Sequence, residues 1–426
     1  MVEKKWECGT NRTLVASMAV LVLTAIMLAL PESALALPSE FPDDTPMVDG
    51  RVRAIEQVGT NIWVGGRFTK VKKRDGTVLA NVANVAVFDS QTEQYKPIAP
   101  SLVGTGAEVW DMMVYGGTGP HADDVLIAGK FSGPSSTKKN LVLVEGAGPD
   151  AGKVIRWYNA PTLKSVLAAP NLSAPGGDGR VYGGGVSLSA FDFATGTKLW
   201  TKAKTTVDPT IRTHDSSPAY RDLELDADGQ TIWAACICDA VGGNPAKALV
   251  KLDIKGNHDT EWSTEAGEAA FGQSVVDHNG KLYLAAGGSD FVAEYDKTAG
   301  GARGWVRDTS GSAQAVAVYD GQLVVGGHFY AVGDQGGDRC GAGRPGDVDQ
   351  KGNPTLDPYG ECQRRQGIAA YSFGGQLDPW DPAYSGSYSL VWELHVEGLR
   401  LHTGGEFKKV SGVVQNSYAR LSPASL

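Results

Sequence analysis

The chain has 426 residues, a formal net charge of −9 at neutral pH and 55 glycines. Its basic residues are scattered rather than clustered, which argues against an extended groove for nucleic acid. Frequent Gly, Asp and Asn turns, together with scarce helical patterning, predict an all-β protein built from many short strands.

The first 36 residues have the pattern of an export signal. Basic residues precede an apolar run from Leu14 to Leu30, and Ala34-Leu35-Ala36 provides a small-x-small cleavage site. We expect cleavage after Ala36, which leaves residues 37–426 as a single domain that is secreted or associated with the cell surface. The apolar run is long for a signal, so an uncleaved membrane anchor remains the alternative.

A pair of very small residues ends a short apolar run seven times along the rest of the chain. The pairs begin at positions 65, 128, 184, 235, 285, 326 and 404. In each unit a first apolar strand and a glycine-bearing turn precede the strand with the pair. A third strand and a shorter element marked by an aromatic residue follow it. Four antiparallel strands in each of seven units predict a seven-bladed β-propeller.

Two local features of the repeat lead to further predictions. The small pair indicates a bulge or a close backbone approach, because a larger side chain would clash there. The seventh unit stops after its third strand, at residues 418–421, whereas an unassigned segment precedes the first strand of unit one. We therefore expect residues near 40–47 to supply the outer strand of the last blade, which would leave no open edge between the two ends of the chain.

The cysteines that remain after export number four. Cys340 and Cys362 bracket a Gly/Asp/Pro-rich insertion at residues 333–366, in the sixth blade. An even number of cysteines in an oxidising compartment predicts a disulfide between these two. Cys236 and Cys238 lie two apart on one face of a strand, so the sequence leaves two possibilities, a strained disulfide bond or two buried thiols.

Two stretches of the last unit resemble a known repeat. They are residues 404–412, GGEFKKVSG, and residues 416–421, NSYARL; the openings GGRF at 65–68 and GGHF at 326–329 match the first of them. These motifs are similar to the delta-60 repeat of secreted bacterial β-propellers, a domain of unknown function. The resemblance implies a propeller at or outside the cell surface, and it implies no activity and no catalytic residues.

A single segment points to a different family. Residues 190–200, AFDFATGTKLW, are similar to the repeat of pyrroloquinoline-quinone dehydrogenases. The match occurs once, the chain is short for those enzymes, and an Asp-Gly turn with a packing Trp is the preferred explanation. The adjacent Cys-Cys pair that the quinone sites of those enzymes often carry is missing, so we expect no cofactor.

No nucleophile elbow, zinc-binding His-Glu-x-x-His or phosphate loop occurs in the chain. His395 and His402 fall on two neighbouring strands of unit seven and should face one another, either as packed side chains or as a metal pair or general base. Residues 347–353 begin like a calcium loop but lack its closing Glu. We expect no metal.

The main site prediction comes from aligning the units on their small pairs. The alignment places long polar and aromatic side chains of the first strands at one level of the channel, with carboxyl groups next to them. These residues are Arg53, Trp110, Asp111, Arg221, Asp222, Gln273, Gln314, Trp392 and Glu393, and unit three contributes a residue near Ser165. Such a ring suits a polar ligand such as a sugar or a carboxylate, and the alternative is a channel filled by water and ion pairs.

These observations favour an exported, non-catalytic propeller that binds a protein or glycan partner at the cell envelope. No nucleic acid is expected as a partner, and membrane contact is expected only through an uncleaved N-terminal segment. The alternatives are an enzyme at the channel mouth, such as a quinone-dependent dehydrogenase or a lyase/hydrolase, and a purely structural surface domain. The 333–366 insertion is a second candidate surface for a partner.

Overall fold

The computed structural model describes residues 37–116, 119–133, 137–170, 179–208, 217–264, 270–298, 300–336, 340 and 361–423. The expected export signal (residues 1–36) and the calcium-like segment at 347–353 lie outside the described residues. The described part of the chain is entirely strands, turns and loops. It contains no helix with the length and hydropathy needed to cross a membrane.

The first three repeat units each form a four-stranded antiparallel sheet whose strands follow one another in sequence order. Unit one consists of β2 (Arg51–Val58), β3 (Asn61–Arg67), β6 (Val85–Asp89) and β7 (Tyr95–Lys96). Unit two consists of β8 (Val103–Val114), β9 (Asp124–Ser132), β10 (Lys139–Glu145) and β11 (Val154–Trp157). Unit three consists of β12 (Ser165–Ala169), β13 (Arg180–Gly184), β14 (Leu188–Asp192) and β15 (Lys198–Lys202).

The remaining units follow the same order, and units four and six have three strands in their sheets. Unit four has β17 (Ala219–Leu225), β18 (Thr231–Ile237) and β21 (Leu249–Asp253), and unit five has β22 (Phe271–His278), β23 (Lys281–Gly287), β24 (Phe291–Asp296) and β25 (Arg303–Asp308). Unit six has β26 (Ala313–Tyr319), β27 (Gln322–Gly327) and β30 (Ile368–Ser372). Unit seven has β31 (Tyr384–Glu397), β32 (Arg400–Val410), β33 (Val413–Val414) and β34 (Tyr418–Leu421).

Three small ladders lie outside this order. They are β1 (Met47–Val48) with β4 (Lys70–Lys72) and β5 (Val78–Asn81), β16 (Thr205–Thr206) with β19 (Ala240–Val241) and β20 (Asn244–Pro245), and β28 (Ala331–Val332) with β29 (Gln363–Arg364). The last of these ladders joins the two ends of the 333–366 insertion.

The expected fourth strand is regular in units one, two, three and five. In units four and six only one isolated bridge takes its place, Leu252 with His258 and Tyr371 with Leu377. A tight turn precedes each bridge, at Gly256 and Gly375, where a positive φ reverses the chain direction. The chain touches the third strand again after this turn and then leaves, so no ladder develops.

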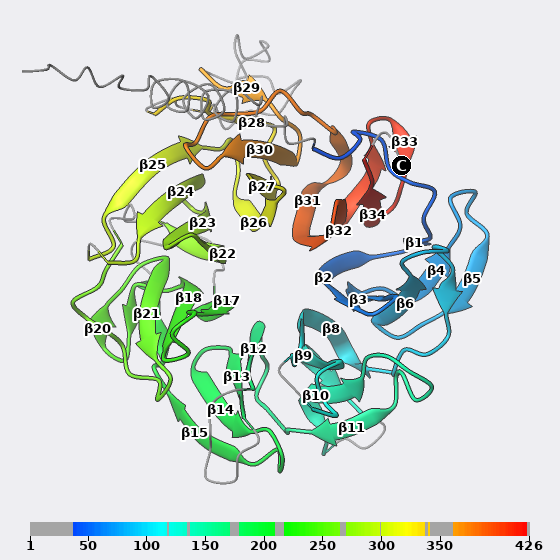
Figure 1. Cartoon of the computed structure of the whole chain (residues 1–426), viewed down its shortest axis with the longest axis horizontal. Helices are drawn as coiled ribbons and strands as arrows, with labels where there is room; N and C mark the ends of the chain where they lie inside the picture. Colours follow the sequence, from blue (N-terminus) through cyan, green and yellow to red (C-terminus); the bar gives the residue numbers. More distant parts are fainter. Residues whose placement is uncertain are drawn as a thin grey trace, which may run out of the picture. The chain divides into compact units, whose positions relative to one another are not determined.

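The hydrophobic core lies between successive units. The first strands contact each other in the order β2, β8, β12, β17, β22, β26 and β31, and β31 in turn contacts β2. Figure 1 shows these strands innermost in residues 37–423, with the later strands of each unit farther out. Apolar clusters fill each junction, including one where Tyr418 of unit seven packs with Phe88 of unit one at 5.1 Å between ring centroids.

The segment before unit one lies against the last unit. Ser39 N–H donates to Ser422 O at 2.8 Å, and Asp43 N–H donates to Arg420 O at 2.9 Å. Two backbone bonds four residues apart place this segment along the outer side of β34 without a continuous ladder. The expected range of 40–47 is therefore too long, because Met47 and Val48 pair with β4 instead.

Both cysteine pairs are joined in the structure. Cys340 bonds to Cys362, as the composition of the insertion predicts. Cys236 bonds to Cys238, which resolves the alternative that the sequence leaves open.

Candidate functional site

A β-bulge occurs in the first strand of six of the seven units, at the position that the alignment selects. The pairing between first and second strands skips Arg53, Trp110, Arg221, Gln273, Gln314 and Trp392. A bulge inserts one residue without a partner and re-aims its side chain. The six residues are called the bulge ring below, and their side chains are therefore directed away from the regular alternation of their sheets.

The small pairs lie opposite these bulges. In unit one the strand pairs Val52 with Gly66 and Ala54 with Gly65, on either side of Arg53. A Cβ on Gly66 would overlap the carbonyl oxygen of Arg51, and a Cβ on Gly65 would overlap Val109 of the next unit. The predicted close approach is confirmed, because one small residue makes room for the bulge and the other for the neighbouring sheet.

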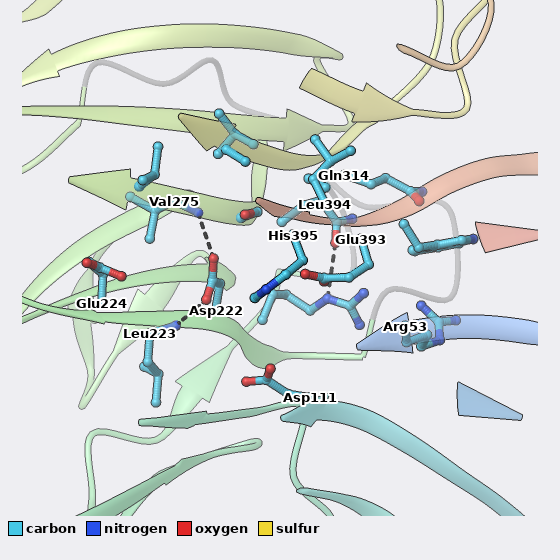
Figure 2. A pocket seen from close by; sticks show the side chains of 18 of the residues that line it. Arg53, Asp111, Asp222, Leu223, Glu224, Val275, Gln314, Glu393, Leu394 and His395 are labelled. Atoms are coloured by element: carbon cyan, nitrogen blue, oxygen red, sulfur yellow. Dashed lines mark hydrogen bonds between the residues drawn. The ribbon is translucent and has the colours of Figure 1, made fainter. Parts of the chain in front are cut away.

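The nine residues of the predicted ring all line one cavity of about 410 Å³. Figure 2 shows Arg53, Asp111, Asp222, Gln314 and Glu393 around it, carried by different strands. This volume lies within the range of pockets that hold small ligands. The geometry thus brings the whole predicted set together, and its role in binding stays a prediction.

Cations and tryptophans stack at one level of the cavity. The guanidinium of Arg53 lies between two indoles, 3.9 Å from the Trp110 ring centroid and 4.1 Å from that of Trp392. Lys164 Nζ lies 2.9 Å from the Trp110 centroid, and the Arg221 guanidinium lies 5.0 Å from it. Cation–π contacts of this kind hold the positive groups in fixed places.

Polar contacts fix the rest of the bulge ring. Arg53 Nε donates to Glu108 Oε1 at 2.5 Å, and Arg221 Nε donates to Gln273 Oε1 at 3.0 Å. The Gln314 amide lies 2.8 Å from Nδ1 of His328. Burial lowers the pKa of Arg53 to about 9 and that of Arg221 to about 10, so both guanidiniums remain charged at neutral pH.

Five carboxyl groups line the same cavity beside the bulge ring. This acidic belt consists of Glu56, Asp111, Asp222, Glu224 and Glu393. Burial raises the pKa of all five: to about 8 for Glu56, Asp111 and Glu224, and also upward for Asp222 and Glu393. Repulsion from neighbouring carboxylates adds to the effect for Glu56, Asp111 and Glu224, so these three carboxyls are mostly protonated at neutral pH.

Two of the belt carboxyls also connect neighbouring units. Asp111 Oδ2 accepts from the backbone N–H of Val166 at 2.7 Å, and Asp222 Oδ2 accepts from that of Val275 at 2.9 Å. Each carboxyl therefore follows a bulge in one unit and binds the first strand of the next, as the dashed line from Asp222 to Val275 in Figure 2 illustrates.

Sequence alignment missed four lining residues that the structure adds. Lys164 occupies the ring position of unit three, where β12 has no bulge and Ser165 pairs directly with Gly184. Glu56, Glu224 and His395 lie three residues after their bulge residues and also line the cavity. Side chains two apart on a strand share a face, so extending the alignment by two positions identifies Glu224 after Asp222 and His395 after Glu393, and in unit one it identifies Glu56 after Ala54.

The two histidines of unit seven pair across β31 and β32, with ring centroids 6.0 Å apart. His402 is buried, contacts the Tyr418 hydroxyl at 2.9 Å and Glu397 at 3.1 Å, and so has a packing role. Burial lowers the pKa of His395 to about 4, which keeps that ring neutral. Among the described residues no group of three His, Cys, Asp or Glu side chains is arranged to hold a metal ion.

Antiparallel sheets joined through their first strands define a β-propeller-type repeat protein. More particularly, the chain belongs to the family described as outer membrane protein assembly factor BamB, whose model matches residues 99–339, more than half of its length. No curated protein matches the chain significantly. The crystal structure of the computationally designed Ika8 protein is similar at a TM-score of 0.44 and 14% identity, covering 89% of this chain and 99% of that chain.

Proposed function

We propose that the protein is an exported, non-catalytic β-propeller that binds a protein or glycan partner at the cell envelope through its channel. The observation that carries this proposal is the bulge ring. In six units, a bulge directs a long polar or aromatic side chain into the same cavity. Bulges that re-aim side chains are typical of functional sites, whereas a channel with only a packing role needs none.

The architecture that we propose has seven blades of the delta-60 type in a single domain at residues 37–426, each built on a four-strand plan that units four and six reduce to three strands and a bridge. The closed succession of contacts among the seven first strands supports the blade number. The backbone bonds of Ser39 and Asp43 to unit seven support the N-terminal segment as the outer strand of the last blade.

Export and envelope association rest on three observations. The first 36 residues have the pattern of a signal, and the two bonded cysteine pairs suit an oxidising compartment. The family to which the chain belongs is described by an outer membrane assembly factor. We propose that the mature protein begins at Leu37.

A glycan array tests the channel as the binding site. Wild-type protein is compared with Arg53→Ala/Trp392→Ala, which removes the stacked cation and one of its indoles. A matched control is Lys202→Ala/Trp200→Ala, because this pair also places a cation near an indole but lies outside the cavity. We expect signals for the wild type and the control and none for the channel variant. Signals that are equal in all three proteins contradict the channel as the site.

The acidic belt favours a second candidate, a lyase or hydrolase acting in the channel. Protonated carboxyls with a pKa of about 8, such as Asp111, have the properties of general acids. Turnover of a bound glycan by the wild type that is lost in Asp111→Asn and Glu393→Gln would establish this candidate in place of the non-catalytic one.

A further inference from the structure

We propose that the channel binds a sugar acid, with its carboxylate among Arg53, Lys164 and Arg221 and its hydroxyl groups toward the acidic belt. This inference rests on the proposed glycan-binding function and names the chemical class of the ligand. Three independent features of the cavity support it.

The first feature is an excess of buried positive charge. Glu108 is paired with Arg53 at 2.5 Å. Among the described residues, neither Lys164 nor Arg221 forms an ion pair, although both line the cavity. Both cations are half-buried and feel the attraction of Glu108 only from beyond ion-pair distance, so a ligand carboxylate placed between them offsets part of the cost of removing them from water.

The second feature is the presence of buried polar groups without partners. Gln314 is only 5% exposed, and within the described part of the chain one end of its side-chain amide has no hydrogen-bond partner. Ser312 N–H donates to Nε2 of His328, so the neutral ring carries its proton on Nδ1 and needs the amide oxygen as acceptor. The amide NH2 is then the unpartnered end, and the indole N–H of Trp392 is a second donor in the same condition.

The third feature distinguishes a sugar acid from a bare carboxylate. A water molecule takes about 30 Å³. On that scale, a cavity of about 410 Å³ is far larger than an acetate ion needs and has room for a hexuronate. Protonated carboxyls both donate and accept hydrogen bonds, and hydroxyl groups need both. Burial keeps Glu56, Asp111 and Glu224 in this form by raising the pKa of each to about 8.

Isothermal titration calorimetry with D-glucuronate tests the proposal, with D-glucose and acetate as partial ligands. We expect glucuronate to bind at least ten-fold more tightly than either. Lys164→Met and Arg221→Met should each weaken glucuronate binding at least ten-fold. Lys202→Met, which removes a cation near Trp200 outside the cavity, should leave it unchanged.

Three outcomes would overturn the inference. Equal affinity for acetate indicates a general carboxylate site, and full competition by sodium sulfate indicates a general anion site. If glucose binds as tightly as glucuronate, the cations do not contribute to ligand affinity, although the channel can still be a glycan-binding site. The thermal unfolding of each variant is recorded alongside, and Lys164→Met alone decides the test where Arg221→Met does not fold.

The glycan array separates this inference from the proposed function. Array signals confined to neutral glycans and lost in Arg53→Ala/Trp392→Ala support channel binding and contradict the sugar acid. Absence of every channel-dependent signal contradicts the proposed glycan function itself.

Discussion

Buried ionisable side chains make individual residues of the channel respond to pH in predictable directions. A carboxyl whose pKa is higher in the folded than in the unfolded protein binds its proton more tightly when folded. Its contribution to stability is complete below the unfolded pKa and is lost as the pH rises through the folded pKa. For Glu56 this window runs from about 4.5 to about 8, with burial as the main cause.

Glu56→Gln should therefore stabilise the protein at high pH and have little effect at low pH. Gln keeps the shape of the protonated acid and removes the cost of ionisation. The gain in the free energy of unfolding should grow between pH 5 and pH 8, by at most about 1.4 kcal/mol per pH unit. Urea unfolding at four pH values measures it. Glu261→Gln, an exposed site outside the cavity, is the control, and a parallel gain in both variants would show that Glu56 is not responsible.

Lys164 should make the affinity for an acidic ligand depend on pH. Burial and the nearby charges of Arg221, Arg53 and Lys130 lower its pKa to about 7, whereas Glu108 acts in the opposite direction. An anion favours the protonated amine, so glucuronate affinity should fall as the pH rises above about 7. Ionisation of the acidic belt near pH 8 acts in the same direction.

The pH profile of Lys164→Met tests this assignment by calorimetry. With the amine removed, only the acidic belt titrates, so the decline should begin about one pH unit higher than in the wild type. A decline that starts at the same pH in both proteins would show that another group controls it.

At the scale of single elements, the bulge on the first strand and the small pair on the second strand depend on each other. The bulged strand comes closer to its neighbour at this point, and only Gly, Ala or Cys is found opposite it in the six bulged sheets. The first residue of the pair faces the next sheet, as Gly404 faces Val52. The small pair thus links the direction of the bulge-ring side chain to the packing between neighbouring units.

Gly66→Ala should destabilise the protein although it adds only one methyl group. The new Cβ would meet the Arg51 carbonyl oxygen and the Val52 Cα, and backbone atoms yield less readily than side chains. We expect a loss of about 1–3 kcal/mol, the usual cost of overpacking, measured by denaturant unfolding. Gly374→Ala is the matched control because its Cβ would meet only Ser372 Oγ at 3.7 Å. Equal losses in both variants would point to a general effect of glycine replacement.

The sequence allowed the six bulge residues to be placed because the small pair marks the facing position on the second strand. The interval to the pair is 12 residues in four units, and longer turns widen it to 14 residues after Arg221 and 18 after Trp110. Lys164 could not be placed in this way, because unit three lacks the bulge and its register differs by one residue. The missing fourth strands of units four and six could not be predicted, because the turns at Gly256 and Gly375 have the same positive φ as the turn at Gly196, which a complete fourth strand follows in unit three. Met47 and Val48 pair with β4, which is distant from them in the sequence, and no local sequence pattern predicts this pairing.

At the scale of the whole described unit, the two ends of residues 37–423 meet at the junction of units seven and one. Asp43 accepts from Arg420 Nε and from Ser422 Oγ, each at 2.6 Å. Arg420 also donates to Ser90 O of unit one at 2.7 Å, and it is 6% exposed. A charged side chain buried to this degree depends on its partners, and loss of one partner of a buried pair costs about 3–5 kcal/mol.

A chain that starts at Gly50 should consequently be much less stable than one that starts at Leu37. It loses the backbone bonds of Ser39 and Asp43, and it leaves Arg420 without its carboxylate from the N-terminal segment. It also uncovers Trp380, whose indole N–H donates to Pro38 O at 2.8 Å, and the edge of β34 becomes free to pair with other molecules. Differential scanning calorimetry and light scattering should show a lower Tm and aggregation on heating. Asp43→Ala in the longer chain isolates the ion pair and should have a smaller effect than the truncation. If the two chain lengths unfold at the same temperature, the N-terminal segment does not close the last blade, because a closing strand must contribute to the cooperative unit that it completes.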